Sequence, residues 1–363
     1  MTAAPPRTFD EALAVLAALP AGFPAAPGRA AGLYRRLARL LHPDTAPAGR
    51  TAEATAAFAR LADAWRRHAG PGSAPQAAQE AARDTGPATA PLTGGLHRYT
   101  PGRLLATGHL AELRAAHYAY GGRRRLAVLK IPLRPRDNDL MEHEAAVLTR
   151  LDTVAEPRHR AYAPVLLESF RQPAPDGTER RVNALHPLTG FHTLADVAAA
   201  HPAGLDPRDA AWMWRRLLTG LGWAHRAGLV HGAVFPEHVL VHPRLHGLVL
   251  ADWCYATAVG TDVPVLVTRH RDRYPPEVLG HLPASPATDI HLASSCIADL
   301  MGAQTPAQLR AFLRGCTLPS QSGRPQDAWL LLAELDDLLE RLYGPRTFRP
   351  FAMPAPRASR SPA

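Results

Sequence analysis

Apolar residues recur at helical spacing in two stretches near the start of the chain. The two stripes consist of Leu33, Leu37, Leu40 and Leu41, followed by Phe58, Leu61, Ala62 and Trp65. Pro43 lies between the stripes and lacks a backbone donor, so we expect it to end the first helix. The pattern therefore predicts an antiparallel helical hairpin with His42, Pro43 and Asp44 at its tip.

The pattern changes at about residue 97, where strand-like segments come first and amphipathic helices follow. The segment "RLAVLKIPL" alternates as a strand does and carries Lys130 near its end. The segment "LMEHEAAVLTRL" has apolar residues at helical spacing, with Glu144 close to that apolar face. The sequence therefore predicts an α+β fold, in which an all-α unit precedes a β-rich and then an α-rich lobe.

Composition sets the expected boundaries between these units. The expected units are a helical domain at 1–69, a flexible linker at 70–96, a two-lobed domain at 97–343 (small lobe about 97–187, large lobe about 188–343) and a disordered tail at 344–363. The linker is mostly Pro, Gly, Ala and Gln and has almost no large apolar side chain to bury. The tail is rich in Pro and Arg, which also disfavours a packed core.

The charge and the cysteines exclude several classes of protein. The formal net charge is +9, but the arginines are scattered and not interleaved with aromatic residues, which disfavours a nucleic-acid partner. Nucleic-acid binding through arginine stays open as a weaker third option. No apolar run reaches ~18 residues, so we expect no membrane-spanning helix. The 3 cysteines form no Cys-x-x-Cys pair, which disfavours a zinc ribbon or a disulfide framework and fits a cytoplasmic protein.

Lys130 is the only lysine among the 41 lysine and arginine residues of the chain. Since arginine is used at every other basic position, the retained lysine indicates a chemical role. A lysine on a strand beside a glutamate on a packed helix can form an ion pair that orients the lysine toward phosphates. The alternative is an edge-strand lysine whose stem lies on apolar surface while its ammonium group reaches solvent.

The helical hairpin resembles the J domain of DnaJ-type co-chaperones over about residues 29–69. The resemblance rests on "YRRLARLL" before the His-Pro-Asp tip and "AAFARLADAW" after it. In that family the tip and the basic helix bind a DnaK-type ATPase chaperone and stimulate its ATP hydrolysis. The matching residues are His42, Pro43 and Asp44 at the tip and Arg35, Arg36 and Arg39 on the basic helix. The usual opening of the family is absent, and "TFDEALAVLAAL" takes its place.

The ordered motifs after the linker resemble the protein kinase fold over about residues 97–343. Lys130 matches the phosphate-contacting lysine, Glu144 its partner on a helix, and Asp252 in "DWC" the magnesium-binding aspartate of Asp-Phe-Gly. Gly108 is the one centrally located glycine in the segment that would cover the phosphates. The resemblance implies a nucleotide site made by these four residues, with ATP and Mg²⁺ as cofactors and Asp252 as the Mg²⁺ ligand.

Three further matches have structural roles in the kinase family. Glu277 in "PPE" matches the glutamate of Ala-Pro-Glu, and Arg324 matches the buried arginine that pairs with it. Asp289, at the start of an apolar helix, matches the aspartate that holds the backbone of the catalytic loop.

The stretch "LVHGAVFPEHVLVHP" differs from a kinase catalytic loop at the positions that carry the chemistry. Ala233 replaces the catalytic aspartate and His238 the metal-binding asparagine, so no catalytic residue is expected. A methyl group has no lone pair with which to accept a proton. Gly232 and Phe235 replace an arginine and a lysine of the loop, and Cys254 replaces the glycine of Asp-Phe-Gly. The large domain therefore resembles a pseudokinase.

Two hypotheses follow from these motifs. In the first, the chain is a co-chaperone-type adaptor that stimulates a DnaK-type ATPase while the pseudokinase domain binds a nucleotide or an unidentified client. In the second, the chain is an atypical serine/threonine kinase with a displaced base, Glu237 or His238. For Lys130, Glu144 and Asp252 a purely structural role also stays open.

Overall fold

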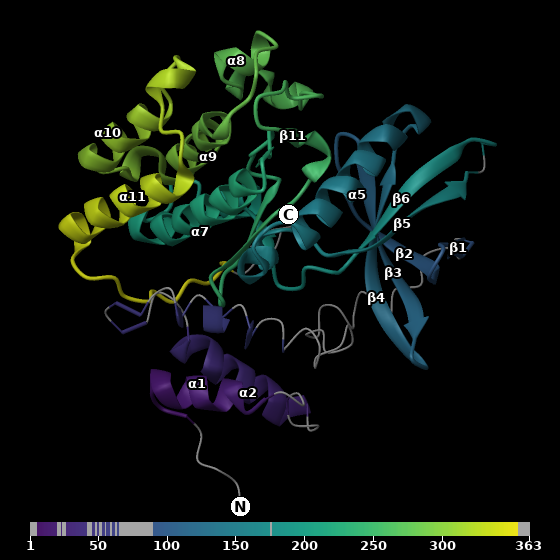
Figure 1. The fold of residues 1–363 in the computed structure, drawn as a ribbon, viewed down its shortest axis with the longest axis horizontal. Coiled ribbons are helices and arrows are strands. Elements are labelled where there is room, and N and C mark those ends of the chain that lie inside the picture. Colours follow the sequence, from purple (N-terminus) through teal and green to yellow (C-terminus); the bar gives the residue numbers. More distant parts are fainter. Residues whose placement is uncertain are drawn as a thin grey trace, which may run out of the picture.

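The computed structural model of the chain contains a β-sheet lobe followed by a helical lobe, with further helices at the N-terminus (Figure 1). The structure describes residues 6–19, 23, 27–41, 46–47, 49–50, 53–54, 56–58, 60–61, 64, 90–174 and 176–354. This mixed α/β architecture agrees with the predicted two-lobed fold. A sheet-rich lobe comes before a helix-rich lobe along the chain, and the two lobes lie side by side.

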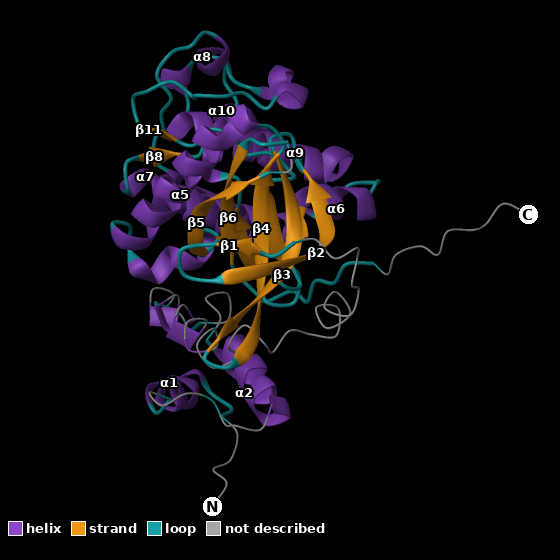
Figure 2. Ribbon diagram, turned by 90° about the vertical axis from the view of Figure 1, so that its right-hand side faces the viewer, coloured by secondary structure: helices purple, strands orange, loops and turns teal. Residues whose placement is uncertain are grey.

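The β-sheet lobe is built on six antiparallel strands in the order β1-β2-β3-β4-β6-β5 (Figure 2). The strands are β1 (Leu92–Thr93), β2 (Arg98–Thr107), β3 (Ala111–Tyr120), β4 (Arg123–Pro132), β5 (Leu166–Pro173) and β6 (Glu179–Leu185). Tyr99 and Phe170 stack at 5.6 Å and pack with Leu129 and Val182 to form the core of the sheet. This core fixes the end of β4, where Lys130 lies.

The β-sheet lobe begins earlier than the predicted start at residue 97. Strand β1 pairs with β2, in the register Leu92 with Tyr99. The buried carboxylate of Glu168 accepts hydrogen bonds from the backbone N–H groups of Leu96 and His97, at 2.9 and 3.0 Å. Residues 90–96, which composition assigns to the linker, therefore form part of the lobe, since a distant carboxylate satisfies their backbone donors.

Helix α5 (Asn138–Thr153) lies beside the sheet, on the side that faces the helical lobe (Figure 1). Its buried face includes Met141, Leu148 and Leu151, at the helical spacing expected from the sequence. The side-chain amide of Asn138 donates to Glu179 O at 2.9 Å and so joins the start of the helix to β6. The helix therefore presents Glu144 toward the sheet from a fixed position.

The helical lobe is organised around a long buried helix, α7, which packs against α9 and α11. The helices of this lobe are α6 (Leu194–Ala200), α7 (Pro207–Arg226), α8 (Pro276–Leu279), α9 (Pro286–Met301), α10 (Ala307–Cys316) and α11 (Ala328–Tyr343). The 3₁₀ helices of both lobes are η3 (Pro135–Asp137), η4 (Pro157–Tyr162), η5 (Trp253–Tyr255), η6 (Thr268–Arg273), η7 (Gly302–Gln304) and η8 (Gln321–Gly323). Asp206 caps the start of α7, and Trp214, Leu217 and Leu221 of that helix are buried.

Two small sheets carry the loops that face the β-sheet lobe. Their strands are β7 (His192–Thr193), β9 (Val239–His242) and β10 (Gly247–Leu250) in one sheet, and β8 (Leu229–Val230) and β11 (Thr257–Ala258) in the other. The loop from β8 to β9 holds the positions that match a catalytic loop, and the segment after β10 holds Asp252. The two segments are thus brought together by the pairing of β9 with β10 and of β8 with β11.

The chain continues to pack on the helical lobe after α11, within the segment predicted as a disordered tail. Phe351 is buried against the rings of Trp212 and His201, with centroids 6.1 and 5.8 Å apart. Arg349 pairs with Asp209 at 2.9 Å. Residues 344–354 are therefore part of the lobe, because aromatic and charged contacts anchor a segment that composition alone assigns to disorder.

The N-terminal helices form a separate hydrophobic cluster. The described helices are α1 (Phe9–Ala17) and α2 (Pro27–Leu40). Thr8 and Glu11 form a capping box at the start of α1. The buried residues of the cluster are Phe9, Ala12, Leu16, Phe23, Ala30, Tyr34, Leu37, Ala38, Leu41, Ala54, Ala57, Leu61 and Ala64. The cluster fits the predicted all-α unit, since Leu37, Leu41 and Leu61 of the two apolar stripes are buried in it.

The predicted tip of this unit, His42, Pro43 and Asp44, lies outside the described residues. Arg36 is exposed on α2, and the side chains of Arg35 and Arg39 also lie outside the described part. Within the part of the chain that the structure describes, no helix combines the length and apolarity needed to cross a membrane.

Candidate functional site

The predicted pair of Lys130 and Glu144 is present and buried. Lys130 Nζ donates to Glu144 Oε1 at 2.7 Å, and the two side chains are 5% and 2% exposed. Asn183, which pairs with Lys130 across β4 and β6, donates from Nδ2 to Glu144 Oε2 at 3.1 Å and to Met141 O at 2.9 Å. Both oxygens of the buried carboxylate are therefore satisfied, and the reading of Lys130 as a solvent-reaching edge lysine is wrong.

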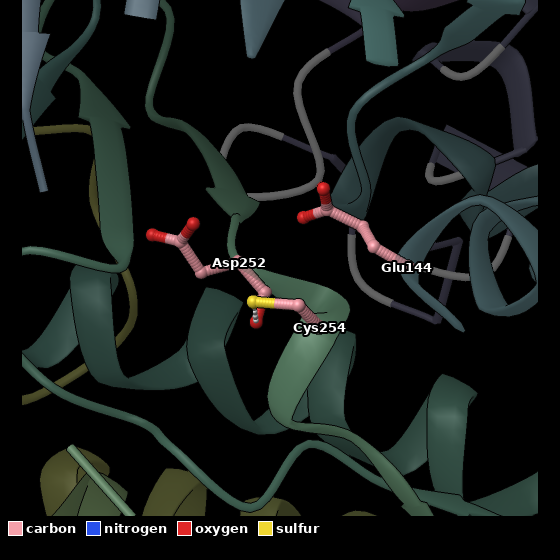
Figure 3. A group of neighbouring side chains, drawn as sticks. All are labelled: Glu144, Asp252 and Cys254. Carbon is pink, nitrogen blue, oxygen red and sulfur yellow. Dashed lines mark hydrogen bonds between the residues drawn. The ribbon is translucent and has the colours of Figure 1, made fainter. Parts of the chain in front are cut away.

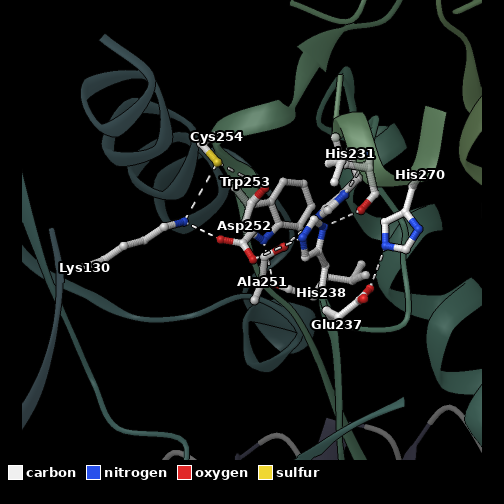
Figure 4. A network of polar contacts seen from close by, with 12 residues as sticks. Lys130, His231, Glu237, His238, Ala251, Asp252, Trp253, Cys254 and His270 are labelled. Carbon is white, nitrogen blue, oxygen red and sulfur yellow. Dashed lines mark hydrogen bonds and ion pairs between the residues drawn. The ribbon is translucent and has the colours of Figure 1, made fainter. Parts of the chain in front are cut away.

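Lys130 also joins the two lobes, because its ammonium group binds Asp252 after β10 (Figure 4). Lys130 Nζ lies 2.5 Å from Asp252 Oδ1, although 122 positions separate the two residues in the sequence. The backbone of Asp252 has φ 61° and ψ 48°, a left-handed conformation that aspartate tolerates better than most residues. The structure thus brings together the lysine, the glutamate and the aspartate that the sequence singled out.

Cys254 completes a group of three side chains with metal-binding atoms (Figure 3). The donor atoms of Glu144, Asp252 and Cys254 lie within 4.8 Å of one another. Lys130 Nζ contacts all three, at 2.7, 2.5 and 3.9 Å. The ammonium group is therefore the cation of this group, and a metal ion between the three side chains would require Lys130 to leave.

The charges of this cluster depend on one another. Burial disfavours the charged form of Lys130, but the nearby Asp252, Cys254 and Glu144 raise its pKa well above the usual value. Burial would raise the pKa of Asp252, yet the ammonium group of Lys130 holds it well below the ordinary range. Burial raises the pKa of Cys254, so its thiol stays protonated and is a poor nucleophile. The cluster therefore holds one cation and an ionised Asp252.

Asp289 fixes the loop between β8 and β9. It is fully buried and accepts from the backbone N–H groups of His231 and Gly232, at 2.7 and 2.9 Å, and contacts His225 Nε2 at 2.9 Å. Gly232 has φ 73°, and an added Cβ would lie 2.9 Å from Tyr255 O. Any residue with a side chain would therefore be strained at this position.

The positions that would carry phosphoryl-transfer chemistry are packed as apolar core. Ala233 is fully buried, and Phe235 is 1% exposed. The ring of Phe235 stacks on His270 at 4.3 Å and meets Tyr274 edge-on at 5.1 Å. Neither a carboxylate nor an ammonium group is available at these two positions, as the sequence indicates.

The two candidates for a displaced base are both engaged by neighbours. Glu237 pairs with His270 at 3.0 Å and with Arg269 at 3.5 Å (Figure 4). His238 Nδ1 lies 2.8 Å from Ala233 O. Burial would raise the pKa of Glu237, but its own backbone N–H and the nearby His270 and Arg269 lower it, which weakens this carboxylate as a base.

Glu277 and Arg324 form the predicted buried ion pair. Arg324 Nη2 donates to Glu277 Oε2 at 2.6 Å, and the side chains are 0% and 4% exposed. Thr288 Oγ1 donates to Glu277 Oε1 at 3.0 Å, and Arg324 Nη1 donates to Ala287 O at 3.0 Å. The pair joins the end of the segment after Asp252 to the chain before α11.

Gly108 lies in the turn between β2 and β3, where its N–H donates to Ala111 O at 2.8 Å. The same hairpin carries Leu113, which pairs with Lys130 across β3 and β4. The turn is therefore connected through β3 to β4, the strand that carries Lys130, by antiparallel pairing.

Two residues of the site were not expected from the sequence. Asn183 is a buried polar residue inside the apolar run "VNALHPL", a pattern that signals a specific hydrogen bond. His231 Nε2 donates to Ala251 O at 2.8 Å, and the ring packs edge-on against Trp253 at 4.6 Å. Burial lowers the pKa of His231 to about 4, so the ring is neutral at neutral pH.

Comparison with known proteins supports a kinase-like domain. No protein-family model matches the chain. The chain is 29% identical over 147 residues to serine/threonine-protein kinase PkaB of Streptomyces coelicolor, which is 36% of this chain and 35% of that protein. The chain thus spans about a third of the length of this relative. This similarity gives no evidence for the J-domain resemblance.

Proposed function

We propose that the kinase-like domain of this chain binds a nucleoside triphosphate and does not transfer its phosphate efficiently. The proposal rests on one observation, the contrast between charged and apolar positions within the same site. Lys130 bridges Glu144 and Asp252 across the two lobes, whereas Ala233 and Phe235 fill the catalytic positions with apolar side chains. The site keeps charged groups that could hold phosphates, and it has no proton acceptor at the positions of Ala233 and Phe235.

The chain's own residues would bind the nucleotide through charge. The ammonium group of Lys130 would contact the phosphates, and Glu144 and Asn183 would hold that ammonium group in position. Phosphate oxygens would be further partners of Lys130, whose ammonium group has three donors and can keep its contacts with Glu144 and Asp252. Mg²⁺ fits the remaining donors poorly, since one oxygen of Asp252 is bound by Lys130 and the other faces the imidazole of His238.

Nucleotide binding is expected to raise the thermal stability of the full chain. ATP at a hundred times its Kd stabilises a folded protein by about 2.7 kcal/mol. We expect Lys130→Ala to weaken ATP binding at least ~10-fold, because a charge-assisted contact to phosphate is lost. Thermal unfolding with increasing ATP, together with calorimetric titration, measures both effects.

Arg123→Ala is the matched control, because Arg123 is an exposed cation at the other end of β4. ATP affinity should be unchanged in this variant. The proposal would be contradicted if ATP did not change the unfolding temperature of the wild-type chain. It would also be contradicted if Lys130→Ala had the same ATP affinity as wild type. The same samples incubated with radiolabelled ATP should incorporate no label. Incorporation that depends on Lys130 would instead favour the atypical kinase with Glu237 or His238 as base.

We further propose that the N-terminal helices make the chain a co-chaperone-type adaptor, which brings a DnaK-type chaperone to whatever the kinase-like domain binds. This proposal is supported by the packed helical cluster around Leu37 and Leu41 and by the exposed Arg36 on α2. A basic helix surface attracts an acidic partner and accelerates its association.

The adaptor is expected to raise the steady-state ATPase rate of a DnaK-type chaperone several-fold, and Asp44→Asn is expected to remove that stimulation. The substitution removes the negative charge that would pair with a cation of the chaperone. Asp337→Asn, at an exposed carboxylate of α11, is the control and should leave the stimulation unchanged. Full stimulation by the Asp44→Asn protein, or none by wild type with the chaperone of the same organism, would refute the adaptor.

A further inference from the structure

His238 lies on the side of Asp252 opposite to Lys130 (Figure 4). His238 Nε2 is 3.5 Å from Asp252 Oδ2, whereas Lys130 binds Oδ1 of the same carboxylate. His238 Nδ1 lies 2.8 Å from Ala233 O. A carbonyl oxygen only accepts, so Nδ1 carries the proton and donates it. Nε2 then faces the carboxylate oxygen at a distance that a cation between the two atoms, either a proton on Nε2 or a metal ion, would bridge favourably.

The imidazole ring is held in this orientation from several sides. Its side chain is 7% exposed, and it stacks on Tyr255 with an interplanar angle of 13° and centroids 5.5 Å apart. Phe235 packs against its edge at 5.9 Å. A histidine that ligates a metal commonly donates its other ring N–H to a backbone carbonyl, as His238 does to Ala233. The ring is therefore preorganised as a nitrogen ligand.

The distance between the two donor atoms distinguishes between classes of ion. Two ligands of a tetrahedral ion with bonds of ~2.1 Å lie about 3.4 Å apart. Adjacent ligands of an octahedral Mg²⁺ with the same bond length lie about 3.0 Å apart, and Mg²⁺ prefers oxygen donors. The 3.5 Å between Nε2 and Oδ2 thus fits the first geometry better. An imidazole nitrogen with a carboxylate oxygen also suits Zn²⁺, Co²⁺ or Mn²⁺ more than Mg²⁺.

We propose that His238 and Asp252 form a nitrogen–oxygen site for a divalent transition-metal ion and select it over Mg²⁺. The inference rests on the proposed function, because phosphate oxygens of the nucleotide and water would supply the remaining ligands. The phosphates would also offset the positive charge that the ion adds next to Lys130. The group of Glu144, Asp252 and Cys254 does not compete for the ion, since the Lys130 ammonium group occupies it.

The test uses the full chain and Co²⁺, which has visible absorption bands that report tetrahedral coordination. We expect Co²⁺ bands with the wild-type protein, stronger when a non-hydrolysable ATP analogue is present. His238→Asn should remove the bands and weaken Mn²⁺ and Zn²⁺ binding at least ~10-fold. Asp252→Asn, which removes the oxygen donor, should also remove them. His281→Asn is the control, because His281 is exposed, has φ 52° that asparagine tolerates, and should leave the bands intact.

Circular dichroism and the unfolding midpoint of each variant show whether a loss of bands reflects a loss of folding. Two folded variants that keep the wild-type bands would overturn the inference, as would a wild-type protein without bands. If the ATP analogue binds, but Co²⁺, Mn²⁺ and Zn²⁺ bind equally well to wild type and His238→Asn, the inference fails while the proposed nucleotide site stands. If Co²⁺ binds through His238 but the ATP analogue does not bind, whether or not an ion is present, the metal site stands and the proposed function fails.

Discussion

Replacing Arg324 with alanine is expected to lower the free energy of unfolding by about 3–5 kcal/mol, which is the usual cost of breaking a buried ion pair. The Arg324 side chain is fully buried, and its removal leaves Glu277 charged and without its cation in a site that is 4% exposed. Arg324 also donates to Ala287 O, so a backbone acceptor in the first turn of α9 loses this partner. Urea denaturation of the full chain measures this loss.

Arg314→Ala is the control for this prediction, because Arg314 is an exposed arginine of the neighbouring α10, and we expect a change within about 0.5 kcal/mol. The double variant Glu277→Ala with Arg324→Ala should lose less than the sum of the two single losses, since no unpaired charge remains. Strictly additive losses would show that the two side chains do not act as a pair.

Replacing Asp289 with alanine is expected to cost about 3–5 kcal/mol as well, because its ionised carboxylate is a shared acceptor in the core. Two backbone N–H groups, those of His231 and Gly232, would lose their partner without access to water. His225, which lies on α7, would lose the carboxylate of Asp289 as its partner. The loss should appear both in urea denaturation and as faster hydrogen exchange in the loop after β8, which Asp289 holds.

A matched control lies on the same helix, where Asp299 is a 55% exposed carboxylate paired with Arg273. Surface ion pairs contribute ~0–1 kcal/mol, so Asp299→Ala should have little effect. If both variants lost the same free energy of unfolding, the hydrogen bonds from the loop backbone to Asp289 would stabilise the fold no more than a surface ion pair does.

These two networks show that the scaffold of the kinase-like domain is kept although its catalytic positions are apolar. Asp289 and the pair of Glu277 with Arg324 hold the loops that frame the site. In the loop between β8 and β9, Ala233 and Phe235 are packed into the core. A site of this kind can bind a ligand stably without carrying out proton transfer.

Much of the candidate site could be predicted from the sequence because its residues have local signals. Lys130 stands out as the single lysine, and Glu144 lies beside the apolar face of a helix 14 positions later. Asp289 follows a helix-start signal, in which Ser285 caps α9 and Pro286 is its first residue. The lobes were also predictable, since strand and helix periodicity are properties of short segments.

Other features have no local signal. The stacking of Phe235 on His270 joins positions whose sequence neighbourhoods give no hint of contact. Residues 90–96 and 344–354 look unstructured by composition, yet Glu168 in one case and Trp212 in the other supply partners from far along the chain. Composition indicates how much apolar surface a segment itself has to bury. It does not indicate which contacts residues far along the chain will make with that segment.

The sequence by itself determined the order of the lobes, the presence of Ala233 where the kinase resemblance implies an aspartate, and the identity of the charged residues in the site. Only the tertiary structure decided that Lys130 binds Glu144 and Asp252 at once, and that His238 directs a ring nitrogen at the free oxygen of Asp252. The physical reason is that residue type fixes which chemistry a side chain can perform. Distance and burial fix which partner it meets, and these depend on the packing of segments more than 100 residues apart, such as Lys130 and Asp252, separated by 122 positions.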